Sequence, residues 1–82
     1  MMANTESIET VAQAILNYLS VHPNAADTED GIHRWWIDWG AAGEEEESPD
    51  TTRLALQLLS DRGAMESVEI ANRRVWHVRR DT

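Results

Sequence analysis

Apolar residues recur with a helical period in three stretches of this chain and alternate with polar residues in a fourth. In the first stretch, Ile8, Val11, Ile15 and Leu19 follow one another at three- and four-residue spacing, which places them on one face of a helix. The pattern predicts a helix over about residues 7–20 whose apolar stripe faces a core.

The second stretch is shorter and rich in tryptophan. It predicts a helix from Thr28 to about Asp38 that carries Trp35 and Trp36. Neighbouring helix positions face in different directions, so we expect at least one of these two tryptophans in the core. An exposed Trp36 or Trp39 would be a candidate partner contact, because tryptophan is enriched at interface hot spots. The alternative is a tryptophan-rich core.

The third stretch opens with Ser48 as the helix cap and Pro49 at the first helical position, and it ends at Gly63. Two short alternating segments follow, near residues 64–70 and 74–79, and predict the strands of a β-hairpin. The predicted turn consists of Ala71, Asn72 and Arg73. In the second strand, Trp76 and Val78 share one face.

This order of elements resembles a winged helix-turn-helix domain, most clearly over residues 52–66, which are similar to the third helix and the following strand of that family. The resemblance extends from about Ile8 to Arg80. It implies an α+β fold, with three helices followed by a two-stranded β-hairpin wing. We expect a single domain over residues 7–80 with an acidic loop at 40–47, and a disordered tail at 1–6. The family pattern also implies which residues of the third helix face the core: Thr52, Ala55, Leu56 and Leu59.

That rotation of the third helix places Leu54 and Leu58 on its outer face. Two leucines four residues apart would form a small apolar ridge for a partner protein or a second copy of the chain. A second rotation, with Leu54 and Leu58 inside and Leu56 outside, is equally compatible with the sequence, because a wide apolar stripe does not fix the angle.

Composition narrows the class of protein. Eighty-two residues make one small domain, and the chain has no cysteine, so we expect no disulfide. No apolar stretch has the length of a membrane span, and the N-terminus lacks the basic and apolar regions of a signal peptide. We therefore expect a cytoplasmic protein without membrane contact.

The distribution of charge disfavours a nucleic-acid partner. The net charge is −8; residues 1–50 carry eleven acidic residues against one arginine, whereas residues 51–82 carry four acidic residues against six arginines. DNA binding depends on Lys and Arg side chains that neutralise phosphates. Here the four glutamates Glu44–Glu47 precede the third helix, whose N-terminal end approaches the major groove in DNA-binding relatives. The arginines near the hairpin can contact phosphates or, alternatively, pair with the chain's own acids.

No pattern in the sequence indicates catalysis. The histidines His22, His33 and His77 are far apart, and the chain has no metal-ligand spacing, glycine-rich phosphate loop or nucleophile motif. We expect no catalytic residue, cofactor, metal ion or small-molecule substrate.

The sequence therefore predicts a non-catalytic protein–protein interaction module, acting alone or as a homodimer. Its candidate partner surface consists of Trp36, Trp39, Leu54 and Leu58. The alternative is a small DNA-binding transcriptional regulator that uses helix 48–62 and an arginine-rich wing. The candidate nucleic-acid contacts are Arg53, Arg73, Arg74 and Arg79.

Overall fold

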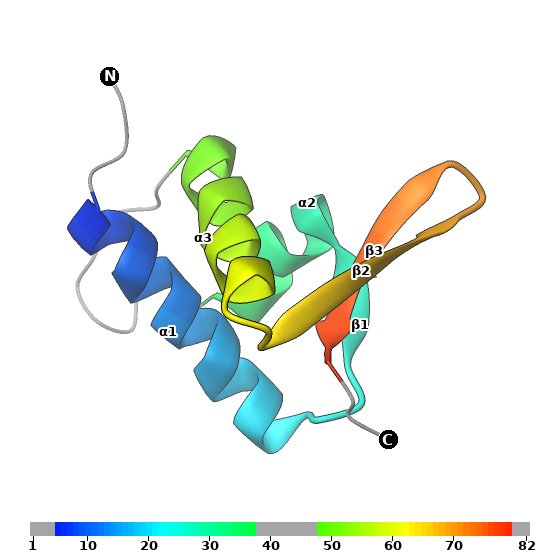
Figure 1. The fold of residues 1–82 in the computed structure, drawn as a ribbon, viewed down its shortest axis with the longest axis horizontal. Helices are drawn as coiled ribbons and strands as arrows, with labels where there is room; N and C mark the ends of the chain where they lie inside the picture. The colour runs from blue at the N-terminus through cyan, green and yellow to red at the C-terminus, as the bar shows by residue number, and fades with distance from the viewer. Residues whose placement is uncertain (1–4, 38–47, 80–82) are drawn as a thin grey trace.

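The computed structural model describes residues 5–37 and 48–79 and shows three helices and one antiparallel sheet (Figure 1). The elements are α1 (Thr5–Val21), β1 (Ala26–Thr28), α2 (Glu29–Gly31), the π-helical turn η1 (Ile32–Trp36), α3 (Pro49–Asp61), β2 (Met65–Ile70) and β3 (Arg73–Val78). The strands lie in the order β1-β3-β2. The predicted α+β arrangement of three helices and a hairpin wing is confirmed, and the sheet has a third strand, β1, that was not predicted.

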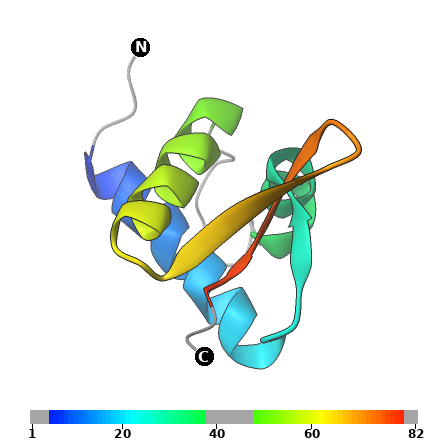
Figure 2. The ribbon, with the colours of Figure 1, turned by 45° about the vertical axis from the view of Figure 1, so that its right-hand side comes forward.

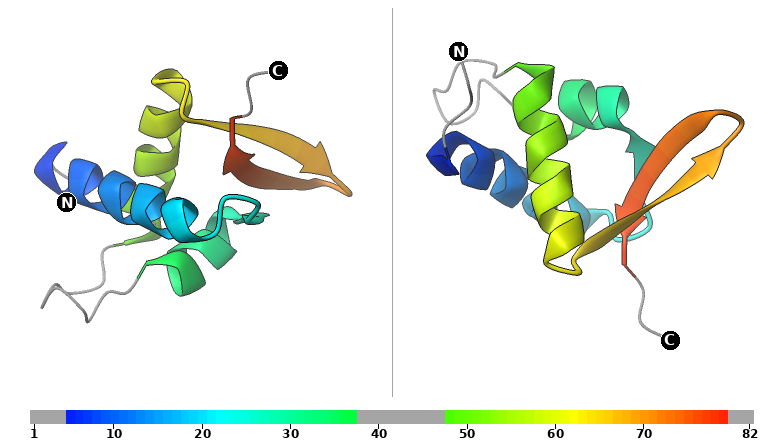
Figure 3. Two further views of the ribbon diagram at one scale, coloured as in Figure 1. Left: turned by 90° about the horizontal axis from the view of Figure 1, so that it is seen from below. Right: turned by 45° about the horizontal axis from the view of Figure 1, so that its top comes forward.

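The helices pack against one another on one side of the molecule, and the β2–β3 hairpin extends beyond them (Figures 2 and 3). The core lies where α1, η1, α3 and the base of the hairpin meet. It includes Val11 and Ile15 of α1 and Leu56 and Leu59 of α3, as predicted, together with Trp76 of β3. Its remaining buried apolar residues are Ala12, Leu19, Ile32, Trp36, Ile37, Ala55 and Met65.

The two ends of α3 differ in how they are capped. Ser48 has the extended conformation of an N-cap but its side chain makes no capping hydrogen bond; its carbonyl accepts from the Thr51 N–H, and Pro49 stands at the start of α3. At the other end, Gly63 has a φ of 77°; its N–H donates to the Ser60 carbonyl and the Ala64 N–H donates to the Leu59 carbonyl. This pair of bonds is a Schellman motif, which needs a left-handed residue and explains why a glycine ends the helix. Helix α1 begins two residues before its predicted start, and residues 1–4 of the expected tail lie outside the described residues.

The structure decides between the two rotations of α3. Thr52, Ala55, Leu56 and Leu59 are buried, whereas Leu54 is 41 % exposed. The rotation implied by the family resemblance is therefore correct, and the one that placed Leu56 outside is wrong. Leu58 lies between the two faces: it is half-buried and packs against the core.

The second helix differs most from its prediction. Thr28 caps it, as its Oγ1 accepts a hydrogen bond of 3.2 Å from the Gly31 N–H, but after one short turn the chain continues as a π-helix from Ile32 to Trp36. A π-helical turn is wider than an α-helical one, so the directions of its side chains change. The predicted end at Asp38 lies outside the described residues.

The hairpin turn is one residue shorter than predicted. Ala71 and Asn72 have φ values of 51° and 68°, so both adopt the left-handed conformation that a two-residue type I′ turn requires. Arg73 belongs to β3, where it pairs with Ile70. Asn72 adopts this conformation readily, whereas an alanine at positive φ is uncommon, and for that reason the turn was predicted one residue too long.

Candidate functional site

The outward side of α3 is a surface that combines an exposed apolar residue with polar neighbours. We call Asp50, Arg53, Leu54, Gln57 and Asp61 the α3 outer face; all five are exposed. The Arg53 Nη2 atom lies 3.0 Å from Asp50 Oδ1, and Gln57 Nε2 donates a 3.1 Å hydrogen bond to Asp61 Oδ1. Leu54 therefore lies between two side-chain pairs that satisfy each other within the helix.

The charge of the α3 outer face is negative. It carries two carboxylates and one guanidinium, and the guanidinium belongs to the ion pair between Arg53 and Asp50. Helix termini and backbone N–H groups can contact phosphates, but a strong electrostatic contribution comes from Lys and Arg. Among the described residues, Arg53 is the one cation on the α3 outer face that a nucleic acid could contact, and it already pairs with the carboxylate of Asp50.

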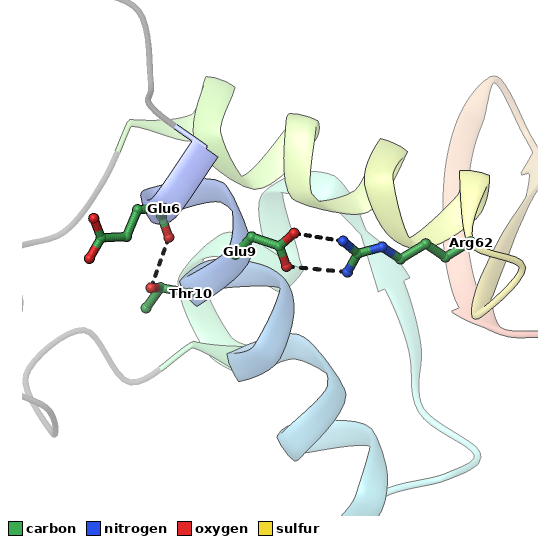
Figure 4. A network of polar contacts seen from close by, with 4 residues as sticks. All are labelled: Glu6, Glu9, Thr10 and Arg62. Atoms are coloured by element: carbon green, nitrogen blue, oxygen red, sulfur yellow. Dashed lines mark hydrogen bonds and ion pairs between the residues drawn. The ribbon is translucent and has the colours of Figure 1, made fainter.

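An ion pair ties the C-terminal end of α3 to α1. Arg62 Nη2 and Nη1 lie 2.6 and 3.2 Å from the two carboxylate oxygens of Glu9, so the contact is bidentate (Figure 4). The hydrogen bonds from Arg62 lower the pKa of Glu9, and those same bonds raise the pKa of Arg62. Glu9 and Arg62 are 53 positions apart in sequence, so this contact connects distant parts of the chain.

A buried hydrogen bond holds the inner side of α3 to η1. The His33 Nδ1 atom lies 2.5 Å from Thr52 Oγ1, and both residues are buried. A buried hydroxyl without a partner destabilises a fold, so this bond favours the rotation in which Thr52 faces η1. From the sequence, His33 was taken as a histidine far from the other two, and this bond was not predicted. The only hint was Thr52, a polar residue on the face of α3 that was expected in the core.

The candidate nucleic-acid residues do not form one cluster. Arg53 is paired on α3, and Arg73 and Arg74 are exposed near the hairpin turn, with Glu69 directly opposite Arg74 on β2. Arg79 lies at the other end of the hairpin, with its guanidinium close to Gly63. At the rise of a strand, Arg74 and Arg79 are roughly 16 Å apart along the chain.

A shallow cleft of about 460 Å³ lies between α2 and the start of β3. Its lining residues are Thr28, Glu29, Asp30, Arg73 and Arg74. The two arginines of the hairpin therefore share this cleft with two carboxylates from the first turn of α2. A phosphate in the cleft would meet charges of both signs, which weakens the case for an anion site.

The tryptophan predictions need a correction. Trp36 is only 6 % exposed, and its ring stacks on Tyr18 at a centroid distance of 4.8 Å, so it is a core residue and not part of a partner surface. Trp35 is 76 % exposed instead. The expectation that at least one of these two tryptophans lies in the core is confirmed, but the candidate contact was the wrong one of the pair: Trp36 follows the buried Ile32 by four positions and faces the same side. Trp39 lies outside the described residues.

In the ranges 5–37 and 48–79, no group of three His, Asp or Glu side chains is arranged to hold a metal ion. No helix in these ranges has both the length and the apolar character needed to cross a bilayer. The chain matches no protein-family model, and no curated protein or solved structure shows significant similarity to it.

Proposed function

We propose that this chain is a non-catalytic winged-helix module that binds a protein, either a partner or a second copy, through the α3 outer face. The observation that carries the proposal is the 41 % exposure of Leu54 on a helix whose other apolar residues are buried or half-buried. An apolar side chain surrounded by polar ones is consistent with the apolar centre and polar rim of a protein contact.

The polar neighbours of Leu54 support a protein rather than a nucleic acid. Arg53 and Gln57 each contact a carboxylate of the same helix, Asp50 and Asp61, so the rim around Leu54 is polar and carries a net negative charge that would repel phosphates. A helix that presents a leucine in this way fits a hydrophobic groove of another protein. The net charge of −8 adds long-range repulsion toward DNA.

One observation favours the alternative function, a DNA-binding regulator. Arg73 and Arg74 are exposed close to the hairpin turn, where they could reach a phosphate backbone. Fluorescence anisotropy with random-sequence duplex DNA tests this alternative directly. Binding in the micromolar range that weakens steeply with salt would support it and contradict the main proposal. We expect no such binding at physiological salt.

The main proposal is tested with Leu54→Glu. Because Leu54 is exposed, we expect the variant to fold, with an unchanged circular dichroism spectrum, and to lose self-association or partner binding in sedimentation experiments. The matched control is Gln13→Glu, which adds the same charge at an exposed position of α1 and should retain assembly. A folded Leu54→Glu variant that assembles like the control would contradict the proposal.

A further inference from the structure

The outer edge of β2 is a second surface, separate from the α3 outer face. The strand order β1-β3-β2 places β3 in the centre, so β2 pairs on one side only among the described residues. Strand β2 is six residues long, twice the length of the other edge strand, β1. The half of β2 near the turn lies on the part of the hairpin that extends beyond the helices (Figure 3).

The register shows which backbone groups point outward. In a hairpin with a two-residue turn, the pair next to the turn, here Ile70 and Arg73, is hydrogen-bonded, and such pairs alternate along an antiparallel ladder. The 3.0 Å bond from the Arg79 N–H to the Ala64 carbonyl fits this alternation. The N–H and C=O groups of Ser67 and Glu69 therefore point away from β3, toward the open edge.

The side chains along this edge combine apolar and acidic character. Val68 and Ile70 are 43 % and 56 % exposed, and they lie on the sheet face opposite to the one that Met65 buries in the core. Glu66 is on the same face as Val68, with its Oε1 atom 3.8 Å from His77 Nε2 of β3, and Glu69 is on the other face, directly opposite Arg74; both glutamates are exposed on the edge strand. An added strand would cover the two apolar side chains and would meet one carboxylate on each face.

Charge decides what kind of strand fits. Two β2 strands can pair antiparallel through their outward groups in several registers. A register that centres on Ser67 places the Glu66 side chains of the two copies diagonally across from each other at about 7–8 Å, and one that centres on Val68 does the same for Glu69. Registers that centre on Glu66 or Glu69 place two glutamates directly opposite each other. Each copy also carries a net charge of −8. Acidic side chains on an edge strand are a known protection against self-pairing, so a second copy is disfavoured.

We propose that the edge of β2 accepts an extended segment of a basic partner polypeptide as a fourth strand of the sheet. The segment places apolar side chains opposite Val68 and Ile70, and Lys or Arg opposite Glu66 and Glu69. Main-chain hydrogen bonds from Ser67 and Glu69 supply binding that does not depend on sequence, and the alternating side chains supply selectivity. This inference is independent of the α3 outer face.

The test uses a capped peptide whose central residues are valine, lysine, valine, threonine and lysine, which is the complement of β2 in antiparallel order. Amide hydrogen exchange is followed by NMR on the full chain. At a peptide concentration about ten times its Kd, exchange at Ser67 and Glu69 should slow by about tenfold, because exchange then proceeds from the free fraction. The amides of α3 should not change.

A peptide N-methylated at alternate residues on its β2-facing side is the matched control, because it keeps every charge and loses the main-chain donors. We expect it to bind at least about tenfold more weakly. An equivalent peptide with glutamates in place of the lysines should not bind. The double variant Glu66→Gln, Glu69→Gln should bind the basic peptide more weakly and with less dependence on salt.

On the protein side, Ser67→Pro removes an outward N–H without touching the β2–β3 ladder and should abolish binding, whereas Ser67→Ala should not. If the Ser67→Pro variant does not fold, the proposal is still tested by comparing the binding of the unmethylated and N-methylated peptides to the unmodified protein. Equal binding of both peptides, protection in α3 instead of β2, or protection of Ser67 and Glu69 that rises with protein concentration alone would each overturn the proposal. The last outcome would identify a second copy as the occupant.

Discussion

The two faces of α3 show how differently similar residues are used within one helix. On the inner face, Thr52, Ala55, Leu56 and Leu59 are at most 1 % exposed. Leu54, only two positions from Leu56, is 41 % exposed between two polar pairs. The identity of a leucine does not determine its role; its angle around the helix does. Stability depends on the inner face, whereas the proposed function depends on the outer one.

Three contacts keep the two faces distinct. His33 binds Thr52 from η1, Arg62 binds Glu9 of α1, and the Schellman motif at Gly63 directs the chain into β2. Each contact involves a different part of α3: the inner face, the C-terminal end and the exit. A rotation of α3 that exposed Leu56 would break the first of them. Substitutions on the inner face are therefore expected to change stability much more than substitutions on the outer face.

The largest expected difference is between Leu56→Ala and Leu54→Ala. Leu56 is fully buried, so its truncation should lower the free energy of unfolding by about 2–5 kcal/mol. A chain of this length has a total stability of roughly 4–12 kcal/mol, so the Leu56 variant should melt far lower. Leu54→Ala should change stability by no more than about 0.5 kcal/mol. Thermal unfolding by circular dichroism measures both, and equal effects would contradict the assigned rotation.

A smaller effect is expected for Thr52→Val, which keeps the volume of the side chain and removes its hydroxyl. The buried His33 ring then loses a partner, and we expect a loss of about 1–3 kcal/mol. Thr10→Val is the control, because the Thr10 hydroxyl is exposed and bonds to the Glu6 carbonyl within α1. Denaturant unfolding compares the two variants. Equal midpoints would mean that the bond between η1 and α3 does not stabilise the fold.

The smallest effect concerns acid pH. The pKa of Glu9 is lowered by its hydrogen bonds from Arg62, so the folded state binds the Glu9 proton more weakly than the unfolded state does. The stabilisation is present above the ordinary carboxyl pKa and is lost as the pH falls through the lowered value. Glu9→Gln should therefore be less stable than the parent at neutral pH, and the difference should shrink in acid. A difference independent of pH would exclude this ion pair as its cause.

Long periodic segments and local turn chemistry were predictable from the sequence. The stripe of Ile8, Val11, Ile15 and Leu19 identified α1, and the cap at Ser48 with the stop at Gly63 identified α3. Strand β1 was not predictable, because three residues show no period. The π-helical turn was missed as well, because a short tryptophan-rich segment does not show how many residues make up each turn.

The candidate site was predictable only in part, because surfaces depend on contacts between distant segments. Leu54 was identified as a candidate, but its exposure follows from the rotation of α3, and the bond from His33, 19 residues away from Thr52, favours that rotation. Leu58 was expected beside it and is instead half-buried. The edge of β2 is open because β3 lies in the centre of the sheet. The alternation of apolar and polar residues within one strand does not show which strands are its neighbours.

Site-specific photocrosslinking tests the central claim, that the α3 outer face binds a protein, most directly. A photoreactive amino acid replaces Leu54 in one variant and the exposed Gln13 of α1 in the other, and both are irradiated in cells of the native host. We predict a discrete protein adduct from position 54 that position 13 does not give. Identical adducts from the two positions, or a nucleic-acid adduct from position 54, would contradict the claim.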